Sequence, residues 1–343
     1  MSSFAAKLIV WQKRHGRHDL PWQGTRDPYL IWLSEIMLQQ TQVATVIPYY
    51  LRFVARFPDV VALAGASLDD VLRLWSGLGY YSRARNLHRA AQLIVTGHGA
   101  RFPRRFEEVA ALPGVGRSTA AAICVFAFGL RQAILDGNVK RVLARLQGIK
   151  GHAGEKKVAD RLWAEAERLL PRRNVETYTQ GLMDLGAAVC TRTKPRCAAC
   201  PAHGGCVAFQ RGWVGKLPAP RPRQPLPQKR TIMLALVRAG EVLLEKRPVT
   251  GIWGGLWCLP EAARKTDLES YCLKRFGAHV VEIEPLPAIA HGFTHYKLDI
   301  APLRLRVSAL APHAAEPGMI WLPIEDARGA AIPAPVRRIL AAL

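Results

Sequence analysis

The chain has 343 residues, half of them hydrophobic, which is long for one average domain and enough for two domains with cores of their own. A formal net charge of +22 and a pI near 10.3 favour a polyanionic partner, and nucleic acid is the first to expect. No apolar run approaches the about 18 residues of a membrane-spanning helix, and the N-terminal apolar stretch is too short for a secretory signal. We therefore expect a cytoplasmic, DNA-associated protein with no membrane partner.

The first clear helix signal is an apolar segment that begins at Pro28. Asp27 and Pro28 form a favourable N-cap and first-turn pair, and apolar residues recur at helical spacing through YLIWLSEIMLQ. Glu35 lies inside this segment, where a carboxylate is costly unless it is paired or protonated. On this segment alone, a structural glutamate is the simpler interpretation.

Helical patterns continue through the N-terminal two thirds of the chain. Thr41 is expected to cap the next helix, and Ser67 with Asp70 resembles a capping box. Later helices are expected over residues 139–149, 155–170 and 174–190. This part of the chain is therefore predicted to be almost entirely α-helical.

A glycine-marked turn, GLGYYSRARNL, leads into a helix that carries Arg83, Arg85 and Arg89. These arginines could simply be solvated, but on so basic a chain contact with DNA phosphates is the favoured interpretation. Tyr80 at this turn could belong to the core, or could act as a wedge or stacking group beside an opened base pair.

Residues 106–140 read as a helix, a tight hairpin, a second helix and a turn that carries an acid. Pro113, Gly114 and Gly116 forbid one continuous helix and permit positive φ. The hairpin can be an ordinary helix–helix connection, or its N–H groups beside a helix N-terminus can bind a phosphate. Asp136 follows in LDGNV, where it is expected at a loop or helix start. A second acid here shifts the interpretation of Glu35 toward catalysis.

Four segments together resemble the helix-hairpin-helix DNA glycosylases, and among these the adenine DNA glycosylase (MutY) family: WLSEIMLQQTQ, GLGYYSRARNL, LPGVGRSTA and LDGNVKRVLAR. The resemblance runs nearly end to end. It implies a base-excision-repair enzyme that hydrolyses the N-glycosidic bond of adenine opposite 8-oxoguanine or guanine in double-stranded DNA. We expect it to act as a monomer.

The resemblance implies roles for the two acids. Glu35 would donate a proton to the departing adenine, and Asp136 would face the sugar as an electrostatic stabiliser or transient nucleophile. We expect burial to raise the pKa of Glu35, whereas Asp136 stays ionised. Related bifunctional enzymes have a lysine where this chain has Ser118, so we predict base removal without efficient β-elimination; Lys140 is a conceivable weak substitute.

The remaining implied contacts are with DNA and bases. Trp22 and Gln180 match positions that line the adenine pocket, although Gln23 replaces an arginine found in some relatives. The residues expected to contact the DNA or the mispair are Gln40, Tyr80, Gly114, Gly116, Ser118, Asn138 and the loop Phe293, Thr294 and His295. That loop matches a Phe-Ser-His sequence that reads 8-oxoguanine, and threonine retains the hydroxyl.

Four of the seven cysteines follow the pattern Cys190-x6-Cys197-x2-Cys200-x5-Cys206. A zinc site is the rival interpretation, but such sites usually have two CxxC pairs and this segment has one. The spacing matches the [4Fe-4S] loop of the endonuclease III and adenine glycosylase group, so we expect that cluster. Its expected role is to hold a basic loop against DNA phosphates.

A proline-rich linker separates two predicted domains, and the pattern beyond it changes to β. We expect a helix-hairpin-helix glycosylase domain over residues 1–215, the linker over 216–230 and a Nudix-like α+β domain over 231–343. The motif GIWGGLWCLPE supports the Nudix resemblance, whereas the Glu-rich metal-binding helix of a working Nudix hydrolase is missing.

Three alternatives remain open. A helix-hairpin-helix glycosylase for oxidised pyrimidines or mismatched thymine is disfavoured by Ser118 and by the second domain. A nucleotide pyrophosphatase with a DNA-binding extension is disfavoured by the missing metal helix. A non-catalytic DNA architectural protein would need neither Glu35 nor Asp136.

Overall fold

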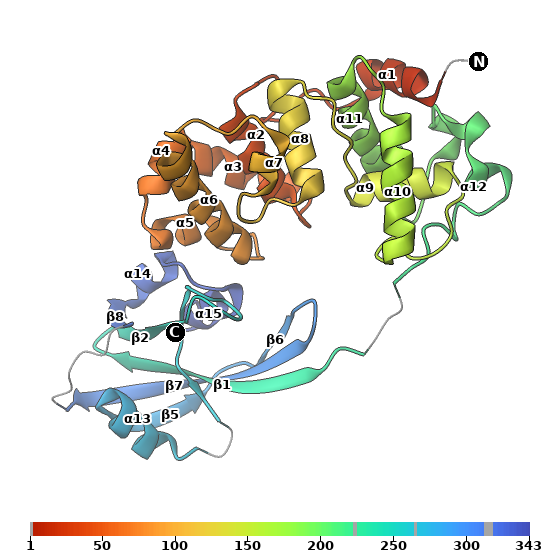
Figure 1. The fold of residues 1–343 in the computed structure, drawn as a ribbon. Coiled ribbons are helices and arrows are strands. Elements are labelled where there is room, and N and C mark those ends of the chain that lie inside the picture. Colours follow the sequence, from red (N-terminus) through yellow and green to blue (C-terminus); the bar gives the residue numbers. More distant parts are fainter. Residues whose placement is uncertain (1–2, 222–224, 264–265, 312–317) are drawn as a thin grey trace. The chain divides into compact units, whose positions relative to one another are not determined.

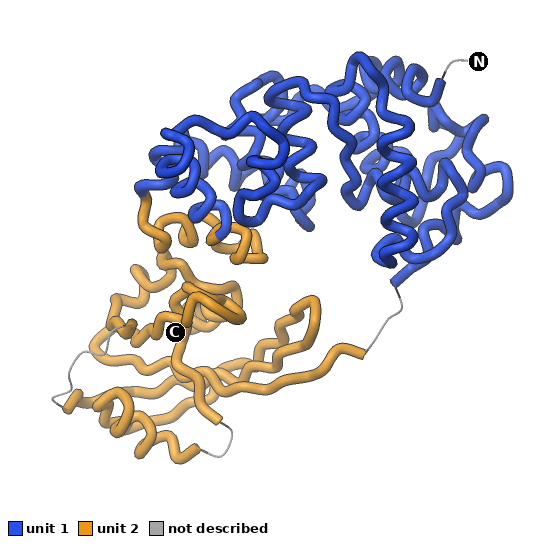
Figure 2. Tube along the Cα trace, viewed as in Figure 1, with its two compact units in different colours: residues 1–65, 86–223 blue, residues 66–85, 224–343 orange. Residues whose placement is uncertain are grey.

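The computed structural model describes residues 3–221, 225–263, 266–311 and 318–343 (Figure 1). The chain forms two compact units (Figure 2). Unit 1 comprises residues 1–65 and 86–223, and unit 2 comprises residues 66–85 and 224–343. Residues 66–85 thus pack with the C-terminal part of the chain, although the sequence places them among the N-terminal helices.

Unit 1 is helical, as the sequence predicts (Figure 1). Its helices are α1 (Phe4–His15), α2 (Pro28–Leu38), α3 (Val43–Arg56), α4 (Val60–Gly65), α7 (Phe106–Ala110), α8 (Arg117–Phe128), α9 (Gly137–Leu146), α10 (Lys156–Leu169), α11 (Val175–Asp184) and α12 (Val207–Gln210), with short turns η1 (Leu185–Val189), η2 (Cys197–Ala199) and η3 (His203–Gly205). Helix α6 (Ser82–His98) begins in the segment assigned to unit 2. One core cluster joins α1, α8, α9, α10 and α11 through buried aliphatic side chains and Tyr178.

Local signals set several helix ends. Asp27 caps α2 by accepting a hydrogen bond from the Tyr29 N–H, with Pro28 at the first helical position. The expected cap at Thr41 is wrong, because α3 begins after Gln42 without a side-chain cap. The Thr41 hydroxyl instead donates to the Gln39 carbonyl at 3.4 Å.

The predicted helix–hairpin–helix is confirmed by α7 and α8. Gly114 has φ +78°, and a Cβ there would lie 2.9 Å from the Cβ of Asn86, so both the turn and the close packing require glycine. Gly116, with φ −88°, is the N-cap of α8 and does not use the left-handed region. Only the first of the two glycines therefore needs the conformational freedom that we expected of both.

Unit 2 contains α5 (Leu68–Trp75) and a mixed sheet with three more helices (Figure 1). The strands are β1 (Gln228–Arg238), β2 (Glu241–Lys246), β3 (Trp257–Cys258), β4 (Glu261–Ala262), β5 (Ala278–Pro285), β6 (Ile289–Gly292), β7 (Lys297–Leu310) and β8 (Met319–Pro323), and the helices are α13 (Leu268–Phe276), α14 (Ile324–Gly329) and α15 (Ala334–Leu340). The sheet order is β3-β2-β1-β7-β5, with β4 paired to β1, β6 to β7 and β8 to β2. Among the strands that the structure describes, β1 and β7 are the parallel pair, from Gln228 opposite Lys297 to Val237 opposite Arg306.

Both faces of the central strand are covered. Residues 233–237 of β1 are all buried, and Leu234 and Leu236 share a core with Cys272 and Phe276 of α13. A turn at Ala239-Gly240 joins β1 to β2, with φ +48° and +81°. Part of the predicted linker, residues 222–224, lies outside the described residues, and its last three residues already belong to β1.

Two of the three arginines near the start of α6 are not free for DNA. Arg83 is 6% exposed, and its guanidinium donates to the carbonyl of Gly79 at 3.1 Å. Arg85 donates to the carbonyl of Gly254 at 2.7 Å. The expected phosphate contact is therefore wrong for Arg83, because its guanidinium is buried and stabilises the turn that carries Tyr80. Arg89, in contrast, is exposed.

In the described part of the chain, no helix has the length and apolar character that crossing a bilayer requires.

Candidate active site

A cavity of about 600 Å³ opens in unit 1. Its wall includes Glu35 from α2, Gln180 from α11 and the loop residues Trp22 and Gln23. The indole of Trp22 packs edge-on against Tyr50, with ring centroids 5.3 Å apart. The structure thus places Trp22 and Gln180, which the resemblance assigned to the adenine pocket, in one cavity with Glu35, although Gln180 lies far from the other two in the sequence.

Glu35 has an unusual protonation behaviour. Its carboxyl lies at the cavity wall, but protein atoms surround it so closely that burial raises its pKa, and the negative charge of Asp136 raises it further, to about 8. The direction is the one expected from the sequence. At neutral pH the side chain therefore holds a proton that it can donate.

Asp136 is the N-cap of α9. Its Oδ1 accepts the Val139 N–H at 2.7 Å, and its Oδ2 lies 3.4 Å from the Asn138 side-chain nitrogen. Burial raises the pKa of Asp136, while these hydrogen bonds and the charge of Arg141 act in the opposite direction. Burial thus raises the pKa of both acids, against the expectation that only Glu35 would be affected, and hydrogen bonds and a nearby cation oppose the rise at Asp136.

Ser118 lies in the first turn of α8, close in space to the Asp136 turn. Its Oγ accepts the Leu135 N–H at 2.9 Å. The hydroxyl of Ser118 therefore makes a structural hydrogen bond between α8 and the segment before Asp136.

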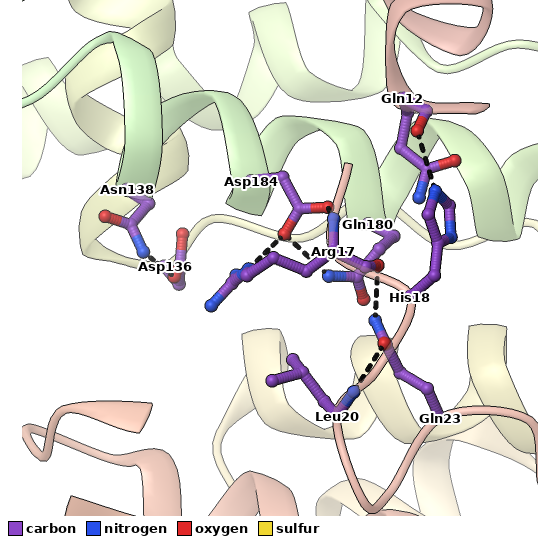
Figure 3. Close-up of polar contacts among 9 residues, drawn as sticks. All are labelled: Gln12, Arg17, His18, Leu20, Gln23, Asp136, Asn138, Gln180 and Asp184. Atoms are coloured by element: carbon purple, nitrogen blue, oxygen red, sulfur yellow. Dashed lines mark hydrogen bonds and ion pairs between the residues drawn. The ribbon is translucent and has the colours of Figure 1, made fainter. Parts of the chain in front are cut away.

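A polar network supports the cavity wall (Figure 3). Asp184 is 1% exposed, and its carboxylate accepts hydrogen bonds from the Arg17 N–H, from Arg17 Nε at 2.7 Å and from Gln180 Nε2 at 2.9 Å. Gln23 bridges the loop by donating to the Arg17 carbonyl and accepting from the Leu20 N–H, each at 3.1 Å. Sequence analysis missed Arg17 and Asp184, because nothing local pairs residues so far apart in the chain.

Two residues expected to enter the DNA have strained backbones. Gln40 follows α2 with φ +58° and is exposed. Tyr80, 41% exposed, has φ +49°. A non-glycine residue at positive φ costs free energy and persists where the surroundings impose it, which is common at functional sites.

A second cavity, of about 380 Å³, lies within unit 2. Tyr80 lines it together with Trp253, Phe293, Thr294 and His295. The Phe293 ring packs against Trp253 at 5.4 Å between centroids, whereas Thr294 and His295 are exposed. Tyr80 and the 293–295 loop were predicted separately, and the fold places them in one cavity.

The four cysteines in the predicted pattern line one small cavity: Cys190, Cys197, Cys200 and Cys206. Arg145, buried on α9, donates to the Cys190 sulfur at 3.3 Å and to the Thr191 carbonyl at 2.7 Å. Across the described ranges, no three His, Cys, Asp or Glu side chains are arranged to hold a single metal ion. The fold thus gathers the four cysteines around one cavity.

Comparison with known proteins gives consistent results over both units. Residues 33–168 match the HhH-GPD superfamily of base excision DNA repair proteins, and residues 232–342 match the NUDIX domain. The chain is 37% identical over 339 residues to the adenine DNA glycosylase of Buchnera aphidicola subsp. Acyrthosiphon pisum (strain APS), covering 98% of this chain and 96% of that protein. It is 34% identical over 403 residues to the adenine DNA glycosylase of Mus musculus, covering 99% and 77%.

Among solved structures, a thermostable thymine-DNA glycosylase is similar, with a TM-score of 0.54 and 29% identity over 61% of this chain and 95% of the other. That likeness covers only part of the chain. The likeness to the adenine-specific enzymes extends through the helical unit and the Nudix-like unit alike. The chain therefore belongs to the adenine DNA glycosylase family.

Proposed function

We propose that this enzyme excises adenine paired with 8-oxoguanine or guanine in duplex DNA by hydrolysis, without an efficient strand-nicking step. The observation that carries the proposal is Glu35, a carboxyl with a pKa of about 8 at the wall of a cavity, with Asp136 near enough to influence it electrostatically. An acid that is still protonated at neutral pH beside a second carboxylate suits the cleavage of a bond to a poor leaving group.

The chemistry follows from the two environments. Adenine in the cavity, beside Trp22 and Gln180, would receive the proton of Glu35 as the glycosidic bond breaks, which improves the leaving group. The sugar then gains positive charge, and the Asp136 carboxylate, held by the α9 N-terminus, would stabilise it. Glu35, now ionised, can take a proton from the attacking water.

The same proposal assigns the DNA contacts. The exposed hairpin glycines Gly114 and Gly116 would let the backbone N–H groups approach a phosphate, with Ser118 and Asn138 close behind. Gln40 and Tyr80 would enter the duplex at the opened pair, each from its strained turn. We infer that one copy of the chain suffices for this interface, on DNA in the cytoplasm.

Recognition of the opposite base is assigned to the second cavity. Phe293 anchors its loop in the aromatic cluster, which leaves the Thr294 hydroxyl and the His295 ring available to 8-oxoguanine. We further propose that the functional domains are residues 1–215 and 231–343, joined by 216–230.

The cysteine-lined cavity would hold one [4Fe-4S] cluster through Cys190, Cys197, Cys200 and Cys206. The donor set fits, because the four cysteines line one cavity and Arg145 donates to the Cys190 sulfur, where its charge would offset that of the bound thiolates. The cluster would supply a structural cross-link to the basic loop that contains Arg192, Lys194 and Arg196.

The opposite-base assignment predicts the result of a single-turnover assay. Duplexes with adenine opposite 8-oxoguanine or guanine should give strand breaks only after alkali treatment. Thr294→Val, which removes the hydroxyl at constant shape, should slow excision opposite 8-oxoguanine by about tenfold, the value of one hydrogen bond. Thr294→Ser is the matched control and should act like the native enzyme. Equal excision rates for Thr294→Val and Thr294→Ser would show that the hydroxyl does not take part in recognition of 8-oxoguanine. If the native enzyme excises adenine from neither duplex, the substrate assignment is refuted.

Ser118→Lys should introduce the missing amine. The variant should form adducts with the sugar that borohydride traps, because lysine then occupies the lyase position. It also loses the hydrogen bond to Leu135, at a cost of about 1–3 kcal/mol in stability. Ser118→Ala loses the same bond without gaining an amine, so it separates the two effects. If Ser118→Lys is folded, binds DNA and still gives no adduct, this position does not face the sugar.

A further inference from the structure

The turn at residues 251–255 lines the second cavity and supports the loop that contains Phe293. Trp253 in this turn is 7% exposed and has φ +55°. Its indole packs against the Phe293 ring, with centroids 5.4 Å apart, and against the His291 ring at 5.7 Å. A non-glycine residue at positive φ needs surrounding contacts that hold it there. The position of the 293–295 loop therefore depends on how this turn is held.

One of those contacts comes from the segment 66–85, which packs in unit 2 (Figure 2). Arg85 lines the same cavity, and its Nη1 donates to the Gly254 carbonyl oxygen at 2.7 Å. A charged donor on a carbonyl makes a stronger hydrogen bond than a neutral one. Two residues earlier, the buried guanidinium of Arg83 lies over the Tyr80 ring, 5.5 Å from its centroid. Neighbouring arginines thus hold the two turns that line this cavity.

We propose that Arg85 is a positioning residue for recognition of the opposite base. By holding the Gly254 carbonyl, it fixes the turn on which Phe293 packs. The 293–295 loop and Tyr80 then meet the mispair as one preassembled reader of 8-oxoguanine, which Arg85 itself does not contact. The inference rests on the proposed recognition of 8-oxoguanine in this cavity, and it adds the residue that keeps the reader assembled.

Arg85→Met removes the donor but keeps an unbranched side chain of similar helix propensity. The ratio of single-turnover excision rates for adenine opposite 8-oxoguanine and opposite guanine should fall by about tenfold, as for one lost hydrogen bond from a charged group. Arg89→Met, one helical turn later at an exposed position, is the matched control and should leave the ratio unchanged. A merely structural role for Arg85 would lower both rates together at a constant ratio, and that result would overturn the proposal.

The salt dependence of DNA binding separates positioning from a phosphate contact. A phosphate contact through Arg85 would make Arg85→Met bind both duplexes more weakly and would reduce the salt slope by about one, because fewer counterions are released. Positioning predicts the native slope.

Arg85→Lys gives the same separation with the charge retained, and it decides if Arg85→Met is unfolded. The lysine side chain is one bond shorter and has no planar guanidinium, so it does not reproduce the bond to the Gly254 carbonyl. The rate ratio should therefore fall at an unchanged salt slope. A lysine variant with the native ratio would contradict the positioning role.

A double variant shows whether Arg85 acts through the loop. Phe293→Ala removes the ring that packs on Trp253, so it should lower the ratio by itself. Arg85→Met/Phe293→Ala should lower the ratio no further, because the support of the turn no longer reaches the loop. Losses that add would mean that Arg85 acts by another route, and the proposal would fall.

Phe293→Ala also separates this inference from the function on which it rests. If Phe293→Ala keeps the native ratio, 8-oxoguanine is not read in this cavity, and the recognition assignment fails together with the inference. If Phe293→Ala lowers the ratio and Arg85→Met does not, only the positioning role is refuted.

Discussion

Glu35→Gln should abolish most adenine excision while leaving the protein folded and able to bind DNA. Glutamine has nearly the same shape but cannot donate the proton to the departing base, and a general acid contributes about 10²–10⁴-fold to a rate. Because burial keeps Glu35 largely protonated at neutral pH, the substitution removes no charge from the cavity at that pH. Single-turnover excision, thermal unfolding and binding to the mispaired duplex measure the three properties separately. Unfolding of the variant, or excision at the native rate, would contradict the assignment.

The pH dependence gives the matching control. Glu35 acts in its protonated form, and its pKa is raised from 4.5 to about 8, so the excision rate should fall as the pH rises through about 8. On the acid side the rate should fall only where Asp136, whose pKa burial also raises, takes up a proton and loses its charge. The unfolded chain ionises this group from about pH 4.5, so the native protein should lose stability relative to Glu35→Gln as the pH rises from there to about 8. A rate that does not fall as the pH rises well above 8 would show that Glu35 is not the acid.

Asp136→Asn should lower excision by at least about 10²–10³-fold, the usual cost of removing one preorganised electrostatic partner from a transition state. Asparagine caps helices as well as aspartate does, so the Val139 N–H keeps an acceptor and α9 should start at the same residue. The loss should therefore be catalytic, with the unfolding temperature nearly unchanged.

The same variant has a second, independent signature. Part of the raised pKa of Glu35 comes from the negative charge of Asp136, so the residual activity of Asp136→Asn should start to fall at a lower pH than in the native enzyme. Asp136→Ala is the comparison for the helix cap, because it removes both the charge and the acceptor and should also destabilise the protein by about 1 kcal/mol. An unchanged pH profile in Asp136→Asn would mean that the two carboxyls do not interact.

The local features of this site could be predicted from the sequence. Asp136 was expected at a helix start because aspartate before a glycine turn is a capping signal, and it is the N-cap of α9. The helix–hairpin–helix at LPGVG, the change to β structure beyond the linker and the common cavity of the four cysteines follow equally from short-range rules of backbone geometry and ligand spacing. The failed cap at Thr41 shows the limit, since α3 begins after Gln42 without a side-chain cap.

Charged residues on helices were harder to interpret. Arg83 looked like a DNA contact because the chain is so basic, but it is buried beneath the Tyr80 turn. Whether an arginine faces solvent or a carbonyl depends on the elements packed around it, and helical spacing does not contain that information.

The sequence by itself determined which chemical groups this enzyme has: two acids in different local settings, four closely spaced cysteines, a glycine hairpin and a serine hydroxyl near its second helix. Only the tertiary structure decided how those groups behave. The pKa of Glu35 depends on the atoms that surround it, and the Gln180 amide is oriented by an aspartate that is itself held by Arg17, 167 residues away in the chain. Backbone propensities act over a few residues, whereas burial and buried polar networks are properties of the complete fold, so they appear only when distant segments have packed together.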